Sequence, residues 1–550
     1  MEDRIESPTQ ERSQVRVLFR PHSASGRAPG RFSAMVRHLY VLAFVFLAAC
    51  RAQEQESTPT PTATPEPTVT PRFTPTPLPT LAATPATSPR DLQVEAMLPD
   101  FADDARLFPE ATRYWIDVRV EFDAGQARGT IDGLSRIKFT NPHDEPLSDI
   151  VLMLWPNDPQ YRAEVRAGPA LIDGKLVLAG VELGGLAQRY ELPEPLGPGE
   201  TLDLTIPFRI TTSGPIGRGN MSRFGITEGV LFAPTFYPLV PRLIEGEWDA
   251  RTAPIGGDTT VSDVSLYQVR IAAPSDQTLV ATGVEVDREP LEDGTLALTY
   301  VSGPTRDFAF ALGPFITQAV EVGGVTVAGW ALAEHEEDLG VMVEAAATQL
   351  ELLVDLIGPY PYTELDLVDV PGAFGGIEYP GLVTVGTLGG PSVIDPTVHE
   401  VGHQWFYGLI GGDQLEEPWL DEAAATYTEI LYHEQVSRRG FATGMLTFFR
   451  DQLRSHPNPE LPIGLAVDDY DSTVDYALFV YRKGALFFDA LRAELGDDLF
   501  FEFLQTYLER NRYRIASAED FQATAEDTCD CDLDSLFDLW VFEGGGTPGL

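Results

Sequence analysis

Hydrophobic and polar positions alternate along the chain between residues 92 and 318. Apolar side chains occupy every second position at 116–122, 202–210 and 308–312, and in the first run Asp117, Arg119 and Glu121 lie between them. Successive side chains of a strand point to opposite faces, so a period of two predicts strands. Gly, Pro and Asp residues separate the runs as turn signals. We therefore predict an all-β domain over residues 92–318.

The pattern changes near residue 319, where apolar residues take a helical spacing and short strands are interspersed. Asp395 and Pro396 are typical first residues of a helix, and two glycines at 411–412 end it. This mixture predicts an α+β domain over residues 319–550. Its helices are predicted at 336–357, 395–410, 418–439, 474–494, 498–509 and 518–525, and its strands at 365–370 and 382–385.

The first part of the chain carries targeting signals. Residues 35–38 form a basic head, and residues 39–48 form an apolar run shorter than the ~20 residues that cross a bilayer. The run ends in Leu-Ala-Ala-Cys, which resembles the lipobox of bacterial lipoproteins. We therefore expect a signal peptide at 35–50, a lipid on Cys50, and residues 1–34 to lie upstream of the true start at Met35. The alternative is a buried strand with an incidental cysteine.

A linker is expected between this signal and the folded domains. Residues 51–91 are rich in Thr and Pro, a composition that favours extended polyproline geometry and buries no core. Lipid, linker and folded domains in this order predict a protein outside the cytoplasm, anchored to a bacterial membrane.

Charge and cysteine content exclude some functions. Lys and Arg number 38 against 83 Asp and Glu, a net charge of −45, and nucleic-acid binding needs a basic face instead. The 3 cysteines are too few for a disulfide framework. Cys529 and Cys531 are expected to be free thiols, with a strained pair or a soft-metal contact as alternatives. His433 and His456 have no partner at ligand spacing and are expected at the surface.

One predicted helix carries a metal-binding pattern, His399-Glu400-Val-Gly-His403. Positions four apart leave the same helix face, so both imidazoles can hold one ion. Glu400 emerges about 100° away, where it can meet a water on that ion. Neutral nitrogen ligands with an open position suit zinc. The alternative is a pair of surface histidines on a structural helix.

A third ligand is expected on the following helix. Glu422 lies 18 residues after His403, and the glycines at 411–412 let the second helix turn back alongside the first. Glu429 lies two turns beyond Glu422 on the same face. It is predicted to hydrogen-bond the outer nitrogen of a ligand histidine, or else to be a solvated helix acid.

These motifs resemble the aminopeptidase N family of gluzincin zinc metallopeptidases. The His-Glu-x-x-His pair, Gln-Trp-Phe at 404–406 and Glu422 look like its zinc site. Gly-Pro-Tyr-Pro-Tyr at 358–362 and Gly-Gly-Ile-Glu-Tyr-Pro-Gly-Leu at 375–382 look like the lead-in and exopeptidase motif of bacterial members. Tyr-Arg-Lys-Gly-Ala at 481–485 resembles the segment with the catalytic tyrosine. The resemblance covers roughly residues 110–545, and we expect a form of the family without the C-terminal helical domain.

The resemblance implies a fold and a catalytic apparatus. The fold would be multidomain, with a saddle-like N-terminal all-β domain followed by a thermolysin-like α+β catalytic domain. The chemistry would need one Zn²⁺ per chain. The roles implied are zinc ligands for His399, His403 and Glu422, general base for Glu400, and oxyanion donor for Tyr481.

The resemblance also implies how a substrate binds. Glu378 would accept hydrogen bonds from the free α-ammonium, and the backbone of Gly375 and Gly376 would lie along the peptide. A turn acid is the alternative for Glu378. Core packing is the alternative for Tyr481, and Tyr476 is a weaker candidate for its role.

The sequence therefore predicts a zinc-dependent aminopeptidase acting on peptides outside the cytoplasmic membrane. Its expected partners are peptides with a free amino terminus and a membrane reached through Cys50; neither the preferred residue nor the oligomeric state is predicted. The alternatives are a zinc endopeptidase or oligopeptidase with an open cleft, and a catalytically silent peptide-binding surface lipoprotein.

Overall fold

The computed structural model describes residues 92–213, 224–254, 256–258, 260–371, 375–386, 393–436 and 439–545. The predicted signal peptide, the lipidation site at Cys50 and the linker at 51–91 lie outside these residues. Within the described part of the chain, no helix combines the length and apolar character that a bilayer crossing requires.

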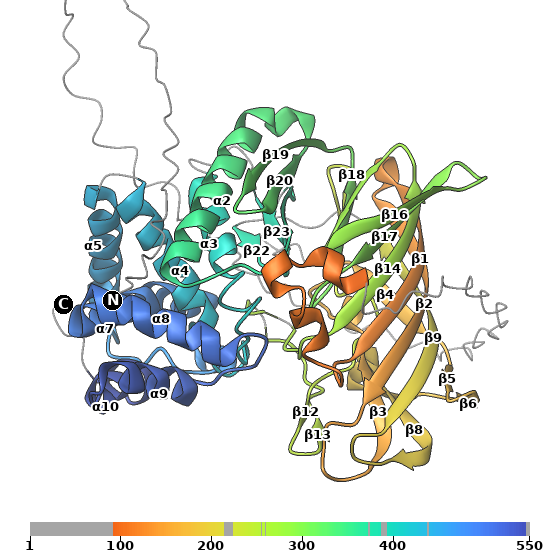
Figure 1. Cartoon of the computed structure of the whole chain (residues 1–550), viewed down its shortest axis with the longest axis horizontal. Coiled ribbons are helices and arrows are strands. Elements are labelled where there is room, and N and C mark those ends of the chain that lie inside the picture. The colour runs from red at the N-terminus through yellow and green to blue at the C-terminus, as the bar shows by residue number, and fades with distance from the viewer. Residues whose placement is uncertain are drawn as a thin grey trace, which may run out of the picture. The chain divides into compact units, whose positions relative to one another are not determined.

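The N-terminal region is built on a long twisted sheet of nine described strands. Figure 1 shows its central strands β14, β1, β2 and β9 side by side, and all the neighbours pair antiparallel except β1 with β14. In β1, Ile116, Val118 and Val120 are buried while Arg119 and Glu121 are exposed, so the alternation marks one buried face. The sheet order is β16 (Val284–Pro290), β17 (Thr295–Val301), β14 (Leu266–Pro274), β1 (Arg113–Asp123), β2 (Arg128–Thr140), β9 (Thr201–Ser213), β5 (Ala170–Ile172) and β6 (Lys175–Val177), with β4 (Ala163–Ala167) also on β9.

Smaller sheets complete this region. Phe308, Phe310 and Leu312 lie in or beside β18 and are fully buried, as their spacing predicts. One sheet has the order β10 (Gly225–Thr227), β11 (Val230–Pro234), β18 (Ala309–Gly313) and β15 (Thr278–Ala281); another has β3 (Leu147–Met153), β8 (Ala187–Leu196) and β7 (Gly180–Glu182); β12 (Leu243–Ile244) pairs with β13 (Glu247–Trp248).

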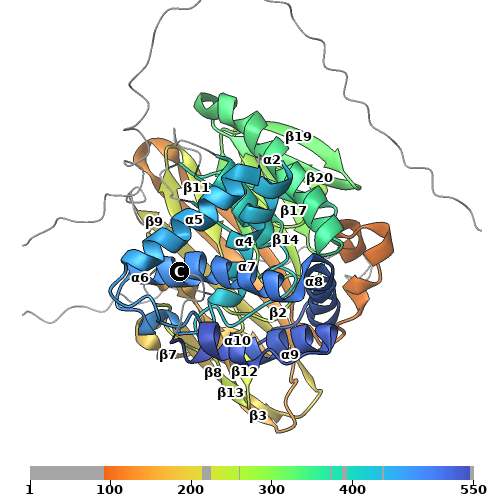
Figure 2. The same cartoon turned by 90° about the vertical axis from the view of Figure 1, so that its left-hand side faces the viewer.

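A mixed sheet and a set of helices form the C-terminal region. The sheet order is β19 (Ile316–Val322), β20 (Val325–Ala331), β21 (Glu364–Asp369), β23 (Leu382–Val385) and β22 (Gly376–Ile377). Helix α2 packs on β19 and β20 (Figure 2), and α3 contacts both α2 and α4. The helices are α2 (Glu336–Leu356), α3 (Ile394–Gly402), α4 (Trp419–Gln435), α5 (Arg439–Ser455), α6 (Thr473–Tyr476), α7 (Gly484–Leu495), α8 (Asp497–Asn511), α9 (Ala518–Cys529) and α10 (Asp534–Phe537), with π-helical turns η9 (Ala477–Lys483) and η10 (Asp538–Phe542). The predicted order, an all-β region followed by an α+β region, is confirmed.

Two glycines allow the helices around α4 to approach closely. A Cβ on Gly402 would lie 2.4 Å from Thr428 Oγ1, and a Cβ on Gly484 would lie 2.3 Å from Ala423 Cβ. Contacts that short require glycine, since real Cβ atoms do not approach so near. The first glycine brings α3 against α4, and the second brings the end of η9 against α4.

One helix prediction is wrong in extent, and another helix has a middle part that is not α-helical. The helix predicted at 395–410 ends at Gly402, because the chain turns after His403 and Tyr407 takes a positive φ of 114°. Trp405, Phe406 and Leu409 are all buried, so the apolar pattern continues through the turn and hides it. The helix predicted at 474–494 runs from Thr473 to Leu495 as α6, η9 and α7, and its middle part is π-helical.

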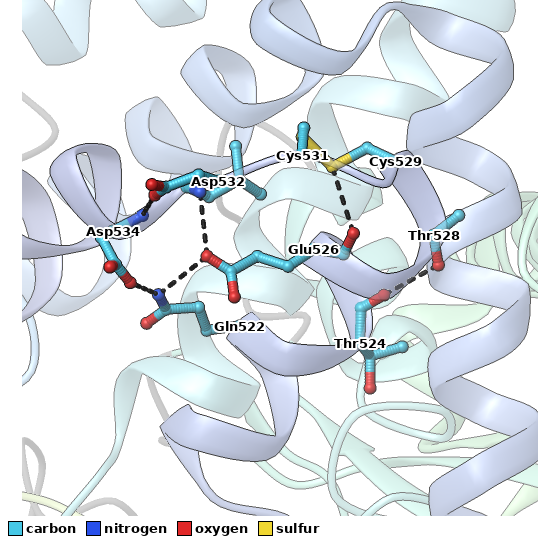
Figure 3. The surroundings of a disulfide bond; sticks show 9 residues. Gln522, Thr524, Glu526, Thr528, Cys529, Cys531, Asp532 and Asp534 are labelled. Carbon is cyan, nitrogen blue, oxygen red and sulfur yellow. Dashed lines mark hydrogen bonds between the residues drawn. A yellow bond between two sulfur atoms is a disulfide. The ribbon is translucent and has the colours of Figure 1, made fainter.

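The expectations for two cysteines and a histidine are also wrong. Cys529 and Cys531 form a disulfide rather than free thiols (Figure 3). Asp530 ends α9 in the left-handed conformation, and this brings the two Cα atoms to 5.1 Å, within disulfide range. His433 is buried, with its Nε2 2.9 Å from Asp395 Oδ1. His456 is half-buried and lies 3.1 Å from Asp475 Oδ1.

Candidate functional site

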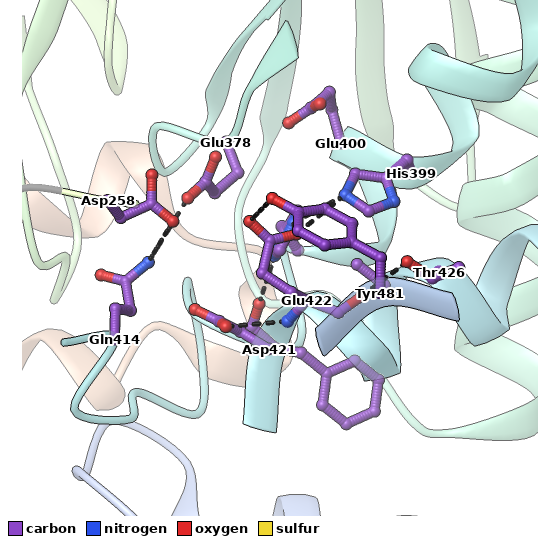
Figure 4. Close-up of polar contacts among 12 residues, drawn as sticks. Asp258, Glu378, His399, Glu400, Gln414, Asp421, Glu422, Thr426 and Tyr481 are labelled. Atoms are coloured by element: carbon purple, nitrogen blue, oxygen red, sulfur yellow. Dashed lines mark hydrogen bonds and ion pairs between the residues drawn. The ribbon is translucent and has the colours of Figure 1, made fainter. Parts of the chain in front are cut away.

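Three donor atoms converge between α3 and α4. His399 Nε2 lies 3.1 Å from His403 Nε2, and Glu422 Oε2 lies 3.2 Å from the first nitrogen and 3.3 Å from the second. His403 and Glu422 are buried, and His399 is largely covered. Figure 4 shows Glu422 reaching from α4 toward the imidazole of His399. The structure therefore brings together the three residues predicted as ligands.

This donor set fits one zinc ion. Donors at about 2.0–2.1 Å from a tetrahedral ion lie roughly 3.3 Å from one another, close to the separations found here. Two imidazoles and one carboxylate leave the fourth position open, as in catalytic zinc sites. Among the described residues, the exposed cluster of Glu526, Asp532 and Asp534 offers only oxygen donors, which suit harder ions.

Both imidazoles are oriented by a partner on the outer nitrogen. His399 Nδ1 lies 2.8 Å from Glu429 Oε1, and His403 Nδ1 lies 3.0 Å from the carbonyl oxygen of Phe406. Each acceptor favours a proton on Nδ1 and leaves the Nε2 lone pair directed into the site. Glu429 is thus placed against His399 and not in solvent.

Glu400 occupies the space beside the donors. It is buried, and its Oε2 has no hydrogen-bond partner among the described residues. Burial raises the pKa of its carboxyl above the usual range, although the two neighbouring histidines lower it. Gly376 leaves the room it needs, since a Cβ there would lie 2.6 Å from Glu400 Oε1. A buried carboxylate with a free oxygen beside an ion site can accept a proton from water.

Tyr481 reaches the donors from the π-helical turn η9. Its hydroxyl donates a hydrogen bond to Glu422 Oε1, the oxygen turned away from the histidines. Its ring stacks on the imidazole of His399 with centroids 5.9 Å apart, and Tyr476 packs edge-on against it. Burial raises the pKa of Tyr481 well above its usual range, so the hydroxyl keeps its proton. Such π-helical turns occur frequently at functional sites.

Glu378 lies at one end of the site, directly after β22. Its side chain is buried, and burial followed by repulsion from Asp258 raises its pKa well above the usual range. The amide of Gln414 donates to Asp258 Oδ2 at 3.2 Å and to Glu378 Oε1 at 3.4 Å (Figure 4). A narrow recess lies here, lined by Asp258, Thr260, Asp307, Ile377, Glu378, Tyr379, Tyr407 and Gln414. We call it the acidic recess.

Sequence reasoning missed Asp258, Gln414 and Asp421. Asp258 comes from a glycine-containing loop of the β region, far from any motif in the sequence, and carries no local signal. Gln414 lies in the turn between α3 and α4. Asp421 directly precedes Glu422; it is buried, one of its oxygens accepts from the backbone N–H of Glu422, and the other has no partner among the described residues. Its adjacency to a predicted ligand was the one available hint.

Comparisons with known proteins agree with this geometry. Residues 342–540 match the family model for the peptidase family M1 domain. The chain is 33% identical over 207 residues to aminopeptidase B of Mus musculus, covering 34% of this chain and 30% of that protein. It is 26% identical over 306 residues to aminopeptidase M1-A of Oryza sativa subsp. japonica, covering 51% of this chain and 34% of that protein. The chain thus spans about a third of the length of these curated relatives.

Solved structures establish the fold over a longer stretch. An M1 zinc metallopeptidase from Deinococcus radiodurans superposes with a TM-score of 0.63 at 21% identity, covering 80% of this chain and 94% of that one. A point mutant of the same protein has been solved with a Tyr-Ser-Ala substrate bound. The match extends over the β region as well as the helices.

Proposed function

Because residues 342–540 match the peptidase family M1 domain, we propose that the chain is a zinc-dependent aminopeptidase. The observation that carries the proposal is the convergence of His399, His403 and Glu422 on one point, with donor separations of 3.1–3.3 Å. The acidic recess beside it supplies a place for the substrate's amino terminus. The relative from Deinococcus radiodurans, which has been solved with a tripeptide substrate, supports peptides as the substrate class.

The catalytic roles follow from the positions of the side chains. Bound zinc supplies a Lewis acid that polarises the scissile carbonyl and lowers the pKa of water. Glu400 takes the proton of the attacking water on its unpaired carboxylate and later passes it to the leaving amine. Tyr481 stays protonated and swings its hydroxyl from Glu422 to the developing oxyanion. Glu429 holds the ring of His399 in place.

The acidic recess binds the free α-ammonium of the substrate. Glu378 and Asp258 supply two carboxylates from different regions of the chain, held together by the amide of Gln414. No Lys or Arg is among the described residues that line the recess. The backbone of Gly375 and Gly376 runs beside it, and β22 is the last described strand of its sheet, so an extended peptide can pair along it.

Comparing free and blocked substrates tests this proposal. We expect the full-length protein to hydrolyse leucyl-p-nitroanilide and to leave its N-acetyl form nearly untouched. Glu378→Gln and Asp258→Asn should each lower kcat/KM on the free substrate by about 10–100-fold, since each loses a charge-assisted contact to the ammonium. Asp276→Asn is the control, because Asp276 is exposed in the turn between β14 and β15.

The other outcomes identify the rival functions. Equal rates on free and blocked peptides would point to a zinc endopeptidase or oligopeptidase and remove Glu378 from its role. A zinc-loaded protein that binds peptides without turnover would point to a silent binding protein.

Tyr481→Phe should lower kcat by about 10²–10³-fold with little change in KM, because the lost hydroxyl acts on the oxyanion in the transition state. Steady-state kinetics on the free substrate measure the effect. Tyr476→Phe is the matched control, as its ring packs on Tyr481. A Tyr481→Phe protein with wild-type kcat would leave core packing as the role of this ring.

We also propose that the enzyme acts outside the cytoplasmic membrane, anchored through lipid on Cys50. The support is the order of the basic head, apolar run, cysteine and Thr/Pro-rich linker in the sequence. Labelled palmitate should be incorporated by the wild-type protein and not by Cys50→Ser in a bacterial host. Incorporation by both proteins would contradict this assignment.

A further inference from the structure

Arg306 is a fully buried arginine between the β region and the catalytic region. It is 1% exposed and directly precedes Asp307, which lines the acidic recess. Among the described residues its guanidinium donates hydrogen bonds only to backbone carbonyl oxygens. A buried guanidinium that pairs with no carboxylate is costly unless its donors are well placed.

The carbonyls that Arg306 contacts belong to separate segments. Nη1 donates to Ser262 at 3.2 Å, Nε donates to Tyr407 at 2.8 Å, and Nη2 donates to Leu409 at 3.4 Å and to Arg514. The hydroxyl of Ser262 in turn donates a hydrogen bond to the carbonyl oxygen of Arg306. The planar fork of arginine can make these contacts together, whereas the single ammonium of lysine cannot reproduce their directions.

Two of these segments contribute residues that line the acidic recess. Ser262 lies four residues after Asp258, in the segment that comes from the β region. Tyr407 lines the recess from the catalytic region, four residues after His403. The guanidinium of Arg306 therefore ties together two segments that contribute to the recess.

The turn at Tyr407 needs such support because the backbone of Tyr407 is strained. A φ of 114° is unfavourable for a residue with a side chain, and it persists only where the surroundings enforce it. The contact to Arg306 is made by the carbonyl of this residue, and its N–H donates to the carbonyl of Ile410 at 2.8 Å. Strain held in this way is typical of residues that position a functional site.

We propose that Arg306 is a positioning residue for the α-ammonium: its guanidinium fixes the Asp258 segment and the Tyr407 turn at the separation that lets Asp258 and Glu378 bind one amine. This inference rests on the proposed function. The inference predicts that loss of the Arg306 guanidinium weakens binding of the amine specifically, while His399, His403 and Glu422 keep their arrangement.

A pair of inhibitors that differ only in the amine tests the inference. Leucine hydroxamate and 4-methylpentanohydroxamate share the hydroxamate and the side chain, and the second lacks the α-amine. On the full-length zinc-loaded protein, Arg306→Lys should weaken the binding of leucine hydroxamate by about 10-fold or more, because the groups that bind the amine are displaced. Binding of 4-methylpentanohydroxamate should weaken by less than about 2-fold. Zinc content should stay at the wild-type level.

A second variant displaces the guanidinium without deleting it. A Cβ on Gly411 would lie 2.4 Å from Arg306 Cζ, so Gly411→Ala should push the fork away from Tyr407 and reproduce the loss of amine preference. If Arg306→Lys fails to fold, Gly411→Ala still tests the inference. Arg189→Lys is the control. Arg189 also donates several hydrogen bonds, but to the side chains of Asp149 in β3 and Glu182 in β7, in the N-terminal region.

The possible results separate the inference from the proposed function. Equal weakening of both inhibitors, or an unchanged ratio in a folded Arg306→Lys or Gly411→Ala protein, would make Arg306 a purely structural clamp and overturn the inference. A wild-type protein that binds both inhibitors equally well would refute the proposed aminopeptidase specificity, and the inference with it.

Discussion

Replacing Glu400 with glutamine is expected to lower kcat by about 10²–10⁴-fold while the zinc content stays unchanged. Glutamine keeps the shape of the buried side chain, and it cannot accept a proton from the attacking water. The carboxylate is close to the donor atoms without belonging to the triad of His399, His403 and Glu422, so metal retention should not depend on it. Steady-state rates on leucyl-p-nitroanilide and metal analysis of the same preparation measure both quantities.

The control for this substitution is Glu344→Gln on the exposed face of α2, which should leave both quantities unchanged. Loss of zinc from Glu400→Gln would show that Glu400 is a ligand, as in the alternative cluster of Glu378, Glu400 and His403. Wild-type turnover would exclude Glu400 as the base.

Replacing Glu422 with alanine is expected to abolish activity by a different route, through loss of the metal. Its Oε2 is the only carboxylate donor within 3.3 Å of both imidazole nitrogens among the described residues. Removing it also leaves the hydroxyl of Tyr481 without its acceptor. The fall in zinc affinity should exceed the ~10–100-fold that loss of an outer-shell partner such as Glu429 costs. Competition with a fluorescent zinc chelator gives the affinity.

Glu434→Gln is the matched control on the same helix, where Glu434 pairs with Arg492 at 2.9 Å. It should keep wild-type zinc affinity. A Glu422→Ala protein that binds zinc as tightly as the wild type would move the third ligand elsewhere, and the nearest carboxylates are then Glu378 and Glu400.

The sequence was informative about the fold where one rule of periodicity governs a whole element. Ile116, Val118 and Val120 face a core while Arg119 and Glu121 face solvent, so β1 follows from alternation alone. The turn after His403 could not be predicted, because Trp405, Phe406 and Leu409 are buried in a non-helical conformation and still follow an apolar pattern. Burial by tertiary contacts there overrides the local signal.

The residues of the candidate site also fall into those that the sequence predicts and those that it does not. Residues within helical reach of one another, such as His399 and His403, are joined by helix geometry and can be recognised from spacing. Asp258 and Arg306 reach the site through contacts between the two regions, which no local spacing encodes. The disulfide of Cys529 and Cys531 depends on the left-handed conformation of Asp530, which non-glycine residues such as Asp adopt only occasionally.

The position of the metal ion tests the central claim most directly. Anomalous diffraction at the zinc absorption edge, on crystals of the wild-type protein grown with zinc, should give a single strong peak between His399 Nε2, His403 Nε2 and Glu422 Oε2. No peak at this position, or a peak only at the exposed acidic cluster of Glu526, Asp532 and Asp534, would contradict the account.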